Sequence, residues 1–229
     1  MNNETMNLAE FMKHELVDET LFHIGPIGIS ESTVVSWVVM AVIVVLCLIL
    51  GSNLKVHNIS KRQAVAELFV TKLENLILGI TGPRGKPYAC YLFTVLVFLG
   101  LCNIMGVFGF KPPTKSLIVP LPLALMSIVL VQIACIRTKK VGGWLKSFRN
   151  PINILDLITR PLSLCMRLFG NILGAFVIME ILNYITKVVA PAIFGLYFDF
   201  FDGILQAYVF TYLTCMYIKE AVELPGDEH

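Results

Sequence analysis

An uncharged, predominantly apolar run of 18 residues, from Thr33 to Leu50, constrains the fold of this chain more than any other feature. A helix of about 20 predominantly apolar residues crosses the hydrocarbon core of a bilayer, so this run spans it with the help of its flanks. The whole chain is 56% hydrophobic and only 15% charged, whereas soluble domains are about a quarter charged. These features predict an all-α polytopic membrane protein that behaves as one unit.

Charge and apolar periodicity divide the sequence further. Between 61 and 79, apolar residues such as Val65, Leu68 and Phe69 recur at helical spacing opposite charged residues, which predicts an amphipathic helix at the membrane interface. Five transmembrane helices are expected in addition. The expected segments are 1–32, polar and outside; 33–60, the first transmembrane helix and its inner flank; 61–87, the interfacial helix and a linker; 88–136, transmembrane helices two and three; 137–151, a basic cytoplasmic loop; and 152–229, a long helical hairpin with the C-terminal tail.

Lys and Arg predict the orientation, because cytoplasmic loops carry an excess of cations. Of the 18 cations, six lie between the first two spans and five follow the third. The N-terminus is therefore expected outside and the C-terminus in the cytoplasm. The sequence shows no secretory signal and no arginine-rich transit peptide. This favours a bacterial cell (inner) membrane, with an organelle-encoded protein as the alternative.

The last two helices are too long for simple crossings. A helix over 152–186 would reach ~52 Å, against a hydrocarbon core of ~30 Å. Either it breaks at Arg160-Pro161 or it is strongly tilted. We expect a tilted hairpin, since Pro161 and Pro191 are each also compatible with a first helical turn.

Arg167 is the residue least expected in its surroundings, since at least two turns of apolar helix flank it on each side. A charge in hydrocarbon costs from about 3 to well over 10 kcal/mol, so such a residue normally faces a polar pathway or a partner charge. It belongs to a polar stripe at helical spacing. With Arg160, the stripe contains Ser163, Asn171 and Gly174, and Gly170 adjoins it.

Acidic residues lie on both sides of Arg167 along the chain. Asp199, Asp202 and Gln206 would share one face of the last helix, and Gln206 is expected near Arg167, its amide oxygen accepting a hydrogen bond from the guanidinium. Glu180 is rotated away from Arg167 and indicates a polar environment on the outer side, whereas Asp156 lies on the inner side. For each acid, simple solvation at the interface, or at a helix start, is the alternative.

Two sets of acids separated by a fixed cation suit ion transfer through two offset half-paths. A continuous water channel would dissipate an ion gradient, whereas a cation in the middle blocks that leak. The same cation stabilises a mobile carboxylate in its deprotonated form.

At these residues the chain resembles subunit a of the F-type ATP synthase. The resemblance is carried by Pro161-Leu-Ser-Leu-Cys-Met-Arg-Leu-Phe-Gly-Asn171, preceded by Asn150-Pro-Ile-Asn-Ile-Leu-Asp156 and followed by Leu205-Gln-Ala-Tyr-Val-Phe210. Asn103-Ile-Met-Gly106, ahead of Pro112-Pro-Thr, is similar as well. It covers roughly residues 88–222, and the N-terminal third matches mainly in layout.

The resemblance implies a role in rotary ion transport. Arg167 would be the essential stator arginine that meets each carboxylate of a rotating ring of c subunits, with Asn171 and Gln206 near it. Ions would enter by one half-channel, ride the ring and leave by the other. The expected partners are the c-ring, the b subunits of the peripheral stalk, indirectly the F1 head, and membrane lipid, with no nucleic acid.

The sequence departs from the family's pattern at two positions. Many members carry an acid nine residues after the arginine, where this chain has Phe176, and Glu180 lies one turn further on. The position seven before Gln206 is histidine in some members and Asp199 here. Whether H⁺ or Na⁺ is carried stays open.

Two other functions remain as alternatives. One is a small secondary transporter in which Arg167 binds an anionic substrate, although no internal repeat supports it. The other is a purely structural membrane subunit, which leaves the acidic stripes unexplained. Nucleotide catalysis by this chain is not expected, because the segment from Gly79 to Pro87 lacks the spacing and the Ser/Thr of a phosphate loop. The histidines and cysteines show no metal-ligand spacing, so neither metal nor cofactor is expected.

Overall fold

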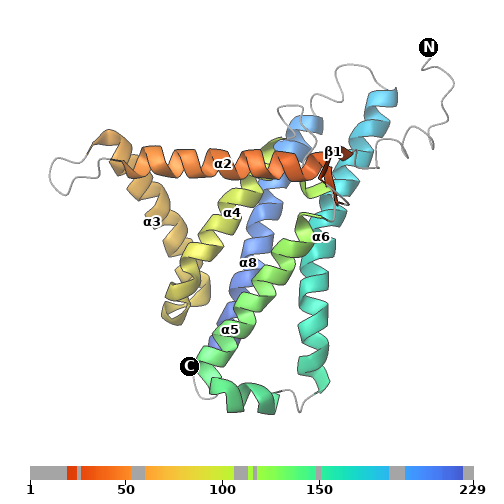
Figure 1. Cartoon of the computed structure of the whole chain (residues 1–229). Helices are drawn as coiled ribbons and strands as arrows, with labels where there is room; N and C mark the ends of the chain where they lie inside the picture. Colours follow the sequence, from red (N-terminus) through yellow and green to blue (C-terminus); the bar gives the residue numbers. More distant parts are fainter. Residues whose placement is uncertain are drawn as a thin grey trace.

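The computed structural model describes residues 20–24, 27–52, 60–105, 113–115, 118–147, 151–185 and 194–223. The chain is an all-α polytopic membrane protein, with one short β-hairpin before the first helix (Figure 1). The hairpin pairs β1 (Thr20–Ile24) with β2 (Ile27–Ser30) in antiparallel fashion. It lies in the segment that the sequence predicted only as polar.

Among the described residues, four helical stretches are long and apolar enough to cross a membrane. They lie in α2 (Glu31–Gly51), in the 3-10 turn η1 (Pro83–Tyr88) with α4 (Ala89–Ile104), in α5 (Pro120–Ser147) and in α6 (Pro151–Ile185). These confirm the first four predicted spans. The fifth corresponds to α8 (Gly203–Val222), which forms the expected helix but is less apolar, so its crossing of the membrane stays a prediction.

The composition of α8 follows from its position, because protein rather than lipid covers much of it. Figure 1 shows α8 between α4 and α5, and it packs against both. Two of its buried polar residues form their hydrogen bonds within the helix. Thr211 and Thr214 donate hydrogen bonds to the backbone carbonyls of Ala207 and Phe210, one turn earlier. A helix in such a position needs little hydrocarbon-facing surface.

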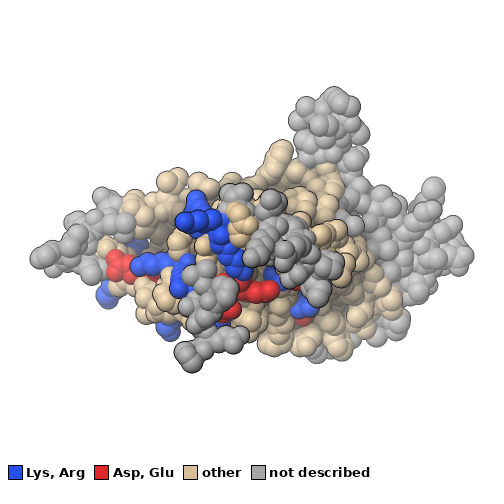
Figure 2. Space-filling view, turned by 90° about the horizontal axis from the view of Figure 1, so that it is seen from below, with Lys and Arg blue, Asp and Glu red and all other residues tan. Residues whose placement is uncertain are grey.

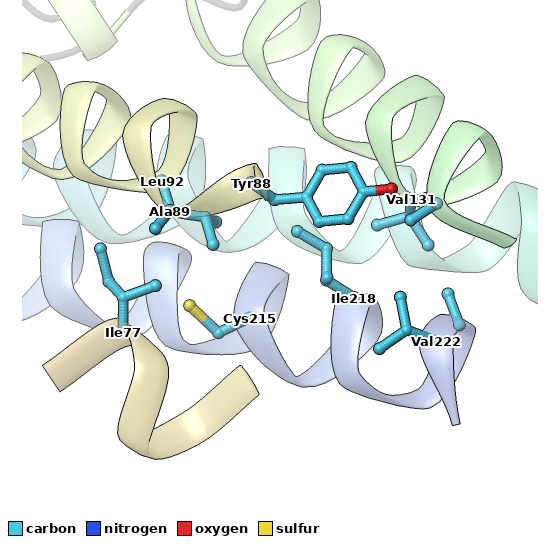
Figure 3. Packing of buried hydrophobic residues seen from close by; sticks show 10 residues of the cluster. Ile77, Tyr88, Ala89, Leu92, Val131, Cys215, Ile218 and Val222 are labelled. Atoms are coloured by element: carbon cyan, nitrogen blue, oxygen red, sulfur yellow. The ribbon is translucent and has the colours of Figure 1, made fainter. Parts of the chain in front are cut away.

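Two apolar clusters hold the other helices around α8. In the cluster of Figure 3, Cys215 and Ile218 of α8 meet Ile77, Leu92 and Val131 from three other helices. The second cluster joins Phe210 to Leu99, Ala124, Leu164 and Leu168. This second cluster fixes the rotation of α6, because Leu164 and Leu168 belong to its buried side.

The amphipathic helix predicted after residue 60 is α3 (Lys61–Thr81). Ile77 and Thr81 are buried, whereas Val65, Leu68 and Phe69 are more than half exposed. The far end of α3 therefore packs deepest into the protein, while the first half keeps much of its apolar surface exposed and contacts α4 through the edge-to-face pair of Phe69 with Phe93. Its interfacial position stays a prediction.

The helix boundaries differ from the predictions in two places. Residues 137–147 belong to α5 rather than to a basic loop, and the helix changes direction at Lys140, whose φ is 58°. The α6 helix continues through Pro161, so the break at Arg160-Pro161, the less favoured of the two alternatives, is not formed. The last helix begins with a π-helical segment, η4 (Leu196–Asp202), before α8. The remaining predicted residues of that helix, 191–193, lie outside the described part.

Candidate functional site

Part of the predicted polar stripe of α6 faces outward, whereas its members Arg160 and Asn171 contact other elements of the chain. Ser163, Arg167, Gly170 and Gly174 are all exposed, whereas Leu164, Cys165 and Leu168 on the opposite side are at most 2% exposed. Since the apolar side packs into the core, these four exposed residues are presented away from the rest of the chain. The spacing correctly predicted that these residues share a face.

Arg167 emerges from a surface that is otherwise apolar. Leu162, Met166 and Ile178 of the same helix are each 45–56% exposed. Within the described part of the chain, the guanidinium of Arg167 makes no ion pair or hydrogen bond. An unpaired cation on an apolar surface is expensive in a membrane, so Arg167 needs a partner that the described residues do not supply.

A hydrogen bond connects the stripe to the segment before α8. The side-chain amide of Asn171 donates to the carboxylate of Asp202 at 2.8 Å. Asn171 lies one helical turn beyond Arg167, so this hydrogen bond ties Asp202 to α6 one turn from the arginine. The structure thus brings together one residue predicted beside the arginine and one predicted in an outer path.

Gln206 does not lie where the sequence predicted it. Its side chain is buried, with 4% of the residue exposed, and its Nε2 has no hydrogen-bond partner among the described residues. Arg167 is exposed on the other side of α6, so the predicted hydrogen bond between the two is not formed. Gln206 instead shares the buried side of α8 with Ala207 and Phe210, which pack into the core.

Asp199 and Glu180, the other two acids predicted in the outer path, lie in η4 and in α6. Asp199 lies in η4, whose i→i+5 hydrogen bonds widen the turn. The α-helical spacing that put it on one face with Asp202 therefore does not apply. Glu180 lies near the end of α6. The side chains of Asp199 and Glu180 lie outside the described residues.

A buried polar network fixes the start of α8. The amide of Asn103, on α4, donates to the backbone carbonyl of Gly203 at 2.8 Å, and its oxygen accepts from the Thr114 hydroxyl at 2.9 Å. Asn103 and Thr114 are both buried. The sequence flagged Asn103 only through the family resemblance. The sequence does carry one sign of this positioning role: Asn103 is a polar amide within an otherwise apolar span.

Asp156, predicted on the inner side, takes part in an ion-pair cluster. Arg160 binds Asp156 at 2.9 Å and Glu220 of α8 at 2.8 Å, and its guanidinium lies 4.9 Å from the centre of the Tyr217 ring. Figure 2, a view onto this end of the molecule, shows acidic and basic side chains side by side. The sequence analysis did not identify Glu220 or Tyr217, since neither interrupts an apolar pattern.

The cluster borders a cavity of about 170 Å³ between α5, α6 and α8. Its wall includes Gln132, Trp144 and Asn153 besides the three charged residues of the cluster. The Trp144 indole donates to Gln132 at 2.9 Å. Such a space is large enough for several water molecules. The inner acid is therefore beside a polar cavity rather than in a hydrophobic core.

Replacing Arg160 by methionine should destabilise the hairpin, because the variant keeps the stem but loses two charge-assisted hydrogen bonds. We expect a loss of roughly 1 kcal/mol or more, reduced by the partial exposure of Asp156 and Glu220. Thermal unfolding of the intact complex would show it as a lower midpoint. Lys219→Met is the matched control, since Lys219 is exposed and its ion pair with Glu223 is 3.9 Å long. Equal midpoints for both variants would contradict a structural role of the cluster.

Comparison with known proteins identifies the family. Residues 33–219 match the family described as ATP synthase A chain. The chain belongs to this family. It is 34% identical to ATP synthase subunit a 2 of Bradyrhizobium sp. over 215 residues, 90% of this chain and 95% of that protein. It is 32% identical to ATP synthase subunit a of Moorella thermoacetica, over 88% of this chain and 95% of the relative. For the Albidiferax ferrireducens protein the identity is 32%, with 93% and 98% covered.

Membership of the ATP synthase A chain family confirms the resemblance given by the segments around Arg167. Among the described residues, no group of three or more His, Cys, Asp or Glu side chains is placed to hold a metal ion.

Proposed function

We propose that this chain is the stator subunit of the membrane sector of an F-type ATP synthase, with two offset half-channels that load and unload ions on the carboxylates of a rotating c-ring. The observation that carries the proposal is the exposed guanidinium of Arg167 on an apolar face, without a partner in the described part of the chain. A ring carboxylate that passes this face would supply the missing anion. Its ion leaves as Arg167 stabilises the ionised form.

The face around Arg167 is shaped for close approach. Gly170 and Gly174 lie on it, and a Cβ added to either would meet nothing within 4 Å. Small residues let the backbone of a second helix come near. These exposed glycines next to the arginine therefore support contact with the outer helices of a ring.

The polar groups on the two sides of Arg167 support the two half-paths. Towards the outside lies the Asn171–Asp202 pair, and we assign Asp199 and Glu180 to the same path from their positions in the chain. Towards the cytoplasm lies Asp156, beside the polar cavity. No single water-filled route needs to connect these groups, because the ring carries the ion between them.

A strong tilt of the hairpin fits the lengths and directions of the helices. The apolar part of α6 covers 27 residues, from Asn153 to Met179, and would reach ~40 Å, more than the ~30 Å hydrocarbon core. The most apolar helix, α2, has only 11% of its spanning stretch buried. In Figure 1 it runs across α4 and α8 rather than beside them. If α2 stands along the membrane normal, the long helices lie tilted.

The proposal places the protein in a bacterial cell membrane with its N-terminus outside and its C-terminus in the cytoplasm. Its partners would be the c-ring, the b subunits of the peripheral stalk and, through them, the F1 head. Nucleotide chemistry belongs to that head, and this chain would contribute only ion translocation.

Disulfide cross-linking tests the ring contact directly. In the assembled complex, with Cys47 and Cys90 replaced by serine because both are exposed, we expect Gly174→Cys or Ser163→Cys to cross-link to cysteines introduced on the outer helix of the c subunit. The native Cys165 is an internal control, since it is 2% exposed on the opposite side of α6. If the exposed positions cross-linked no more than Cys165, the ring contact would be refuted and the transporter and structural alternatives would return.

A further inference from the structure

We propose that Trp144 is a gate between the inner cavity and the cytoplasm, brought to the cavity by the kink at Lys140 and held closed by its hydrogen bond to Gln132. Water and small cations would pass when the indole moves away. The part of this inference that concerns ion transfer rests on the proposed function, since it gives the cavity beside Asp156 a controlled opening on the cytoplasmic side. The gate itself concerns access to the cavity, which can be measured without activity.

The first argument is that the chain folds back after the kink. In a straight α-helix twelve residues rise ~18 Å, so the side chains of Gln132 and Trp144 would not meet. The Trp144 indole nonetheless donates to the Gln132 side chain at 2.9 Å. The reversal occurs at Lys140, whose φ of 58° and ψ of 163° are not helical. In Figure 1 the last part of α5 runs across the lower end of the molecule towards the beginning of α6.

The turn after Lys140 is tight. Its backbone conformation is adopted almost exclusively by glycine, and other residues keep it only where the surrounding contacts require it. A Cβ added to Gly143 would lie 3.2 Å from the Cβ of Lys139, whereas residues four apart in a regular helix have Cβ atoms about 5–6 Å apart. The glycine therefore lets the chain pass close to the end of the preceding helix. This turn carries Trp144 back to the cavity.

The second argument is the place of Trp144 in the wall of the cavity. The wall includes apolar residues such as Ile128 and Leu157 as well as charged residues from the cytoplasmic ends of α5 and α8. Trp144 follows the cytoplasmic end of the straight part of α5 and is half-buried. Among the described residues that line the cavity, it is the single aromatic side chain. A broad, rigid indole obstructs an opening of this size more effectively than a flexible lysine such as Lys139.

The third argument is the difference in strength between the hydrogen bonds of the wall. Arg160 binds the carboxylates of Asp156 and Glu220 at 2.9 and 2.8 Å. Such charge-assisted bonds are roughly twice as strong as bonds between neutral groups. The bond of Trp144 with Gln132 joins two neutral side chains. Opening at Trp144 therefore breaks a weaker bond than opening between α6 and α8 would.

Labelling of a native cysteine tests the gate. Cys135 lines the cavity and is partly exposed. The assembled complex is studied in inverted membrane vesicles, with Cys47 and Cys90 replaced by serine because both are exposed. A small membrane-impermeant cationic methanethiosulfonate is added to the cytoplasmic face, and mass spectrometry reads the modification. We expect Cys135 to react at least tenfold faster in Trp144→Ala than in the protein that keeps the indole.

Two further substitutions separate the hydrogen bond from the bulk of the indole. Gln132→Met keeps the length of the side chain but removes the amide oxygen that accepts the indole N–H, so Cys135 should react at least threefold faster. Trp144→Phe keeps an aromatic cover without the N–H donor. We expect its rate to lie between those of the unaltered protein and Trp144→Ala.

The controls distinguish opening of the gate from loosening of the fold. Trp37→Ala removes the other tryptophan, which is 54% exposed on α2, and should leave the labelling rate of Cys135 unchanged. Cys102 and Cys215 are fully buried and should stay slow in every variant, so acceleration there too would overturn the gate. An unchanged rate at Cys135 in assembled Trp144→Ala would overturn it as well. If that variant does not assemble, an unchanged rate in Gln132→Met overturns it equally.

Ion transfer has a separate test. ATP-driven pumping takes ions from the cytoplasm, so in Trp144→Ala we expect the cytoplasmic ion concentration that half-saturates pumping to fall at least threefold. The outer-ion dependence of ATP synthesis should not change. Both dependences are measured for pH and for Na⁺ separately. Faster labelling with an unchanged cytoplasmic dependence would overturn the ion role of the gate and leave the stator role of Arg167 intact, because that role depends on the activity of Arg167→Ala instead.

Discussion

Membranes that contain the assembled complex with Arg167→Ala should show neither gradient-driven ATP synthesis nor ATP-driven ion pumping. The physical reason is that removal of the cation leaves nothing to keep a ring carboxylate ionised between the two half-paths. Ions could then pass between the paths without rotation, so an increased passive leak is expected as well. Synthesis, pumping and leak should be measured on the same membranes, together with subunit content.

Two further variants sharpen the Arg167 experiment. Arg167→Lys keeps one positive charge but loses the planar, five-donor guanidinium, so we expect it to restrict the leak more than alanine does without restoring normal synthesis. Arg62→Ala removes an exposed arginine at the start of α3 and should leave all three measurements unchanged. Normal coupled synthesis and pumping in Arg167→Ala would be incompatible with the stator role.

Alanine at Gly203 and at Gly100 should have opposite effects on stability. In a helix, glycine to alanine normally stabilises by up to about 1 kcal/mol. We expect such a gain at Gly100, where an added Cβ meets nothing within 4 Å. At Gly203 the added Cβ would lie 2.8 Å from the Cβ of Asn103, an atom that cannot move without the backbone of α4. Overpacking of this kind costs typically about 1–3 kcal/mol.

The expected result is a lower thermal midpoint and less assembled complex for Gly203→Ala, and an equal or higher midpoint for Gly100→Ala. The two substitutions are chemically identical and both lie in helices, so propensity alone predicts the same sign for both. If both variants were stabilised, the close approach of α4 and α8 at Asn103 would be wrong. The measurement is thermal unfolding of the purified complex, with subunit stoichiometry by gel.

The helices could be predicted from the sequence because their signals are local. Apolar runs without charge predicted the spans that became α2, α4 and α5, and alternating faces predicted α3. The same local pattern placed Ser163, Arg167 and Gly174 on one side of α6, where they lie. Residue spacing within one helix is sufficient for such statements.

The neighbours of each face could not be predicted in the same way. The spacing predicted Asp202 and Gln206 on one face, but it did not reveal that Gln206 is buried while Arg167 is exposed. That depends on how α8 packs between α4 and α5, and on the π-turn that precedes it. A π-turn has no clear sequence signal, and the extra residue in its turn changes the side that each following residue faces.

Charge patterns gave a wrong prediction after the third span, because a cation-rich helix and a cation-rich loop have the same composition. Lys139, Lys140 and Lys146 indicated a loop on the cytoplasmic side, yet residues 137–147 are helical apart from the kink at Lys140. Lysine and arginine are good helix formers, so a run of cations predicts the side of the membrane but not the backbone conformation. Arg160-Pro161 indicated a possible break for a similar local reason, and the packing of α6 overrides it.

The polar contacts between the two arms of the hairpin have a mechanical consequence. The ion pair of Arg160 with Glu220 joins α6 to the far end of α8, and the bond of Asn171 with Asp202 joins it to the segment before the near end. Arg167 lies between these two supports. A rod held on both sides of a load bends far less at the loaded point than one held on a single side. A ring that drags on Arg167 as it turns would therefore displace it little, and its height relative to both half-paths would persist under torque.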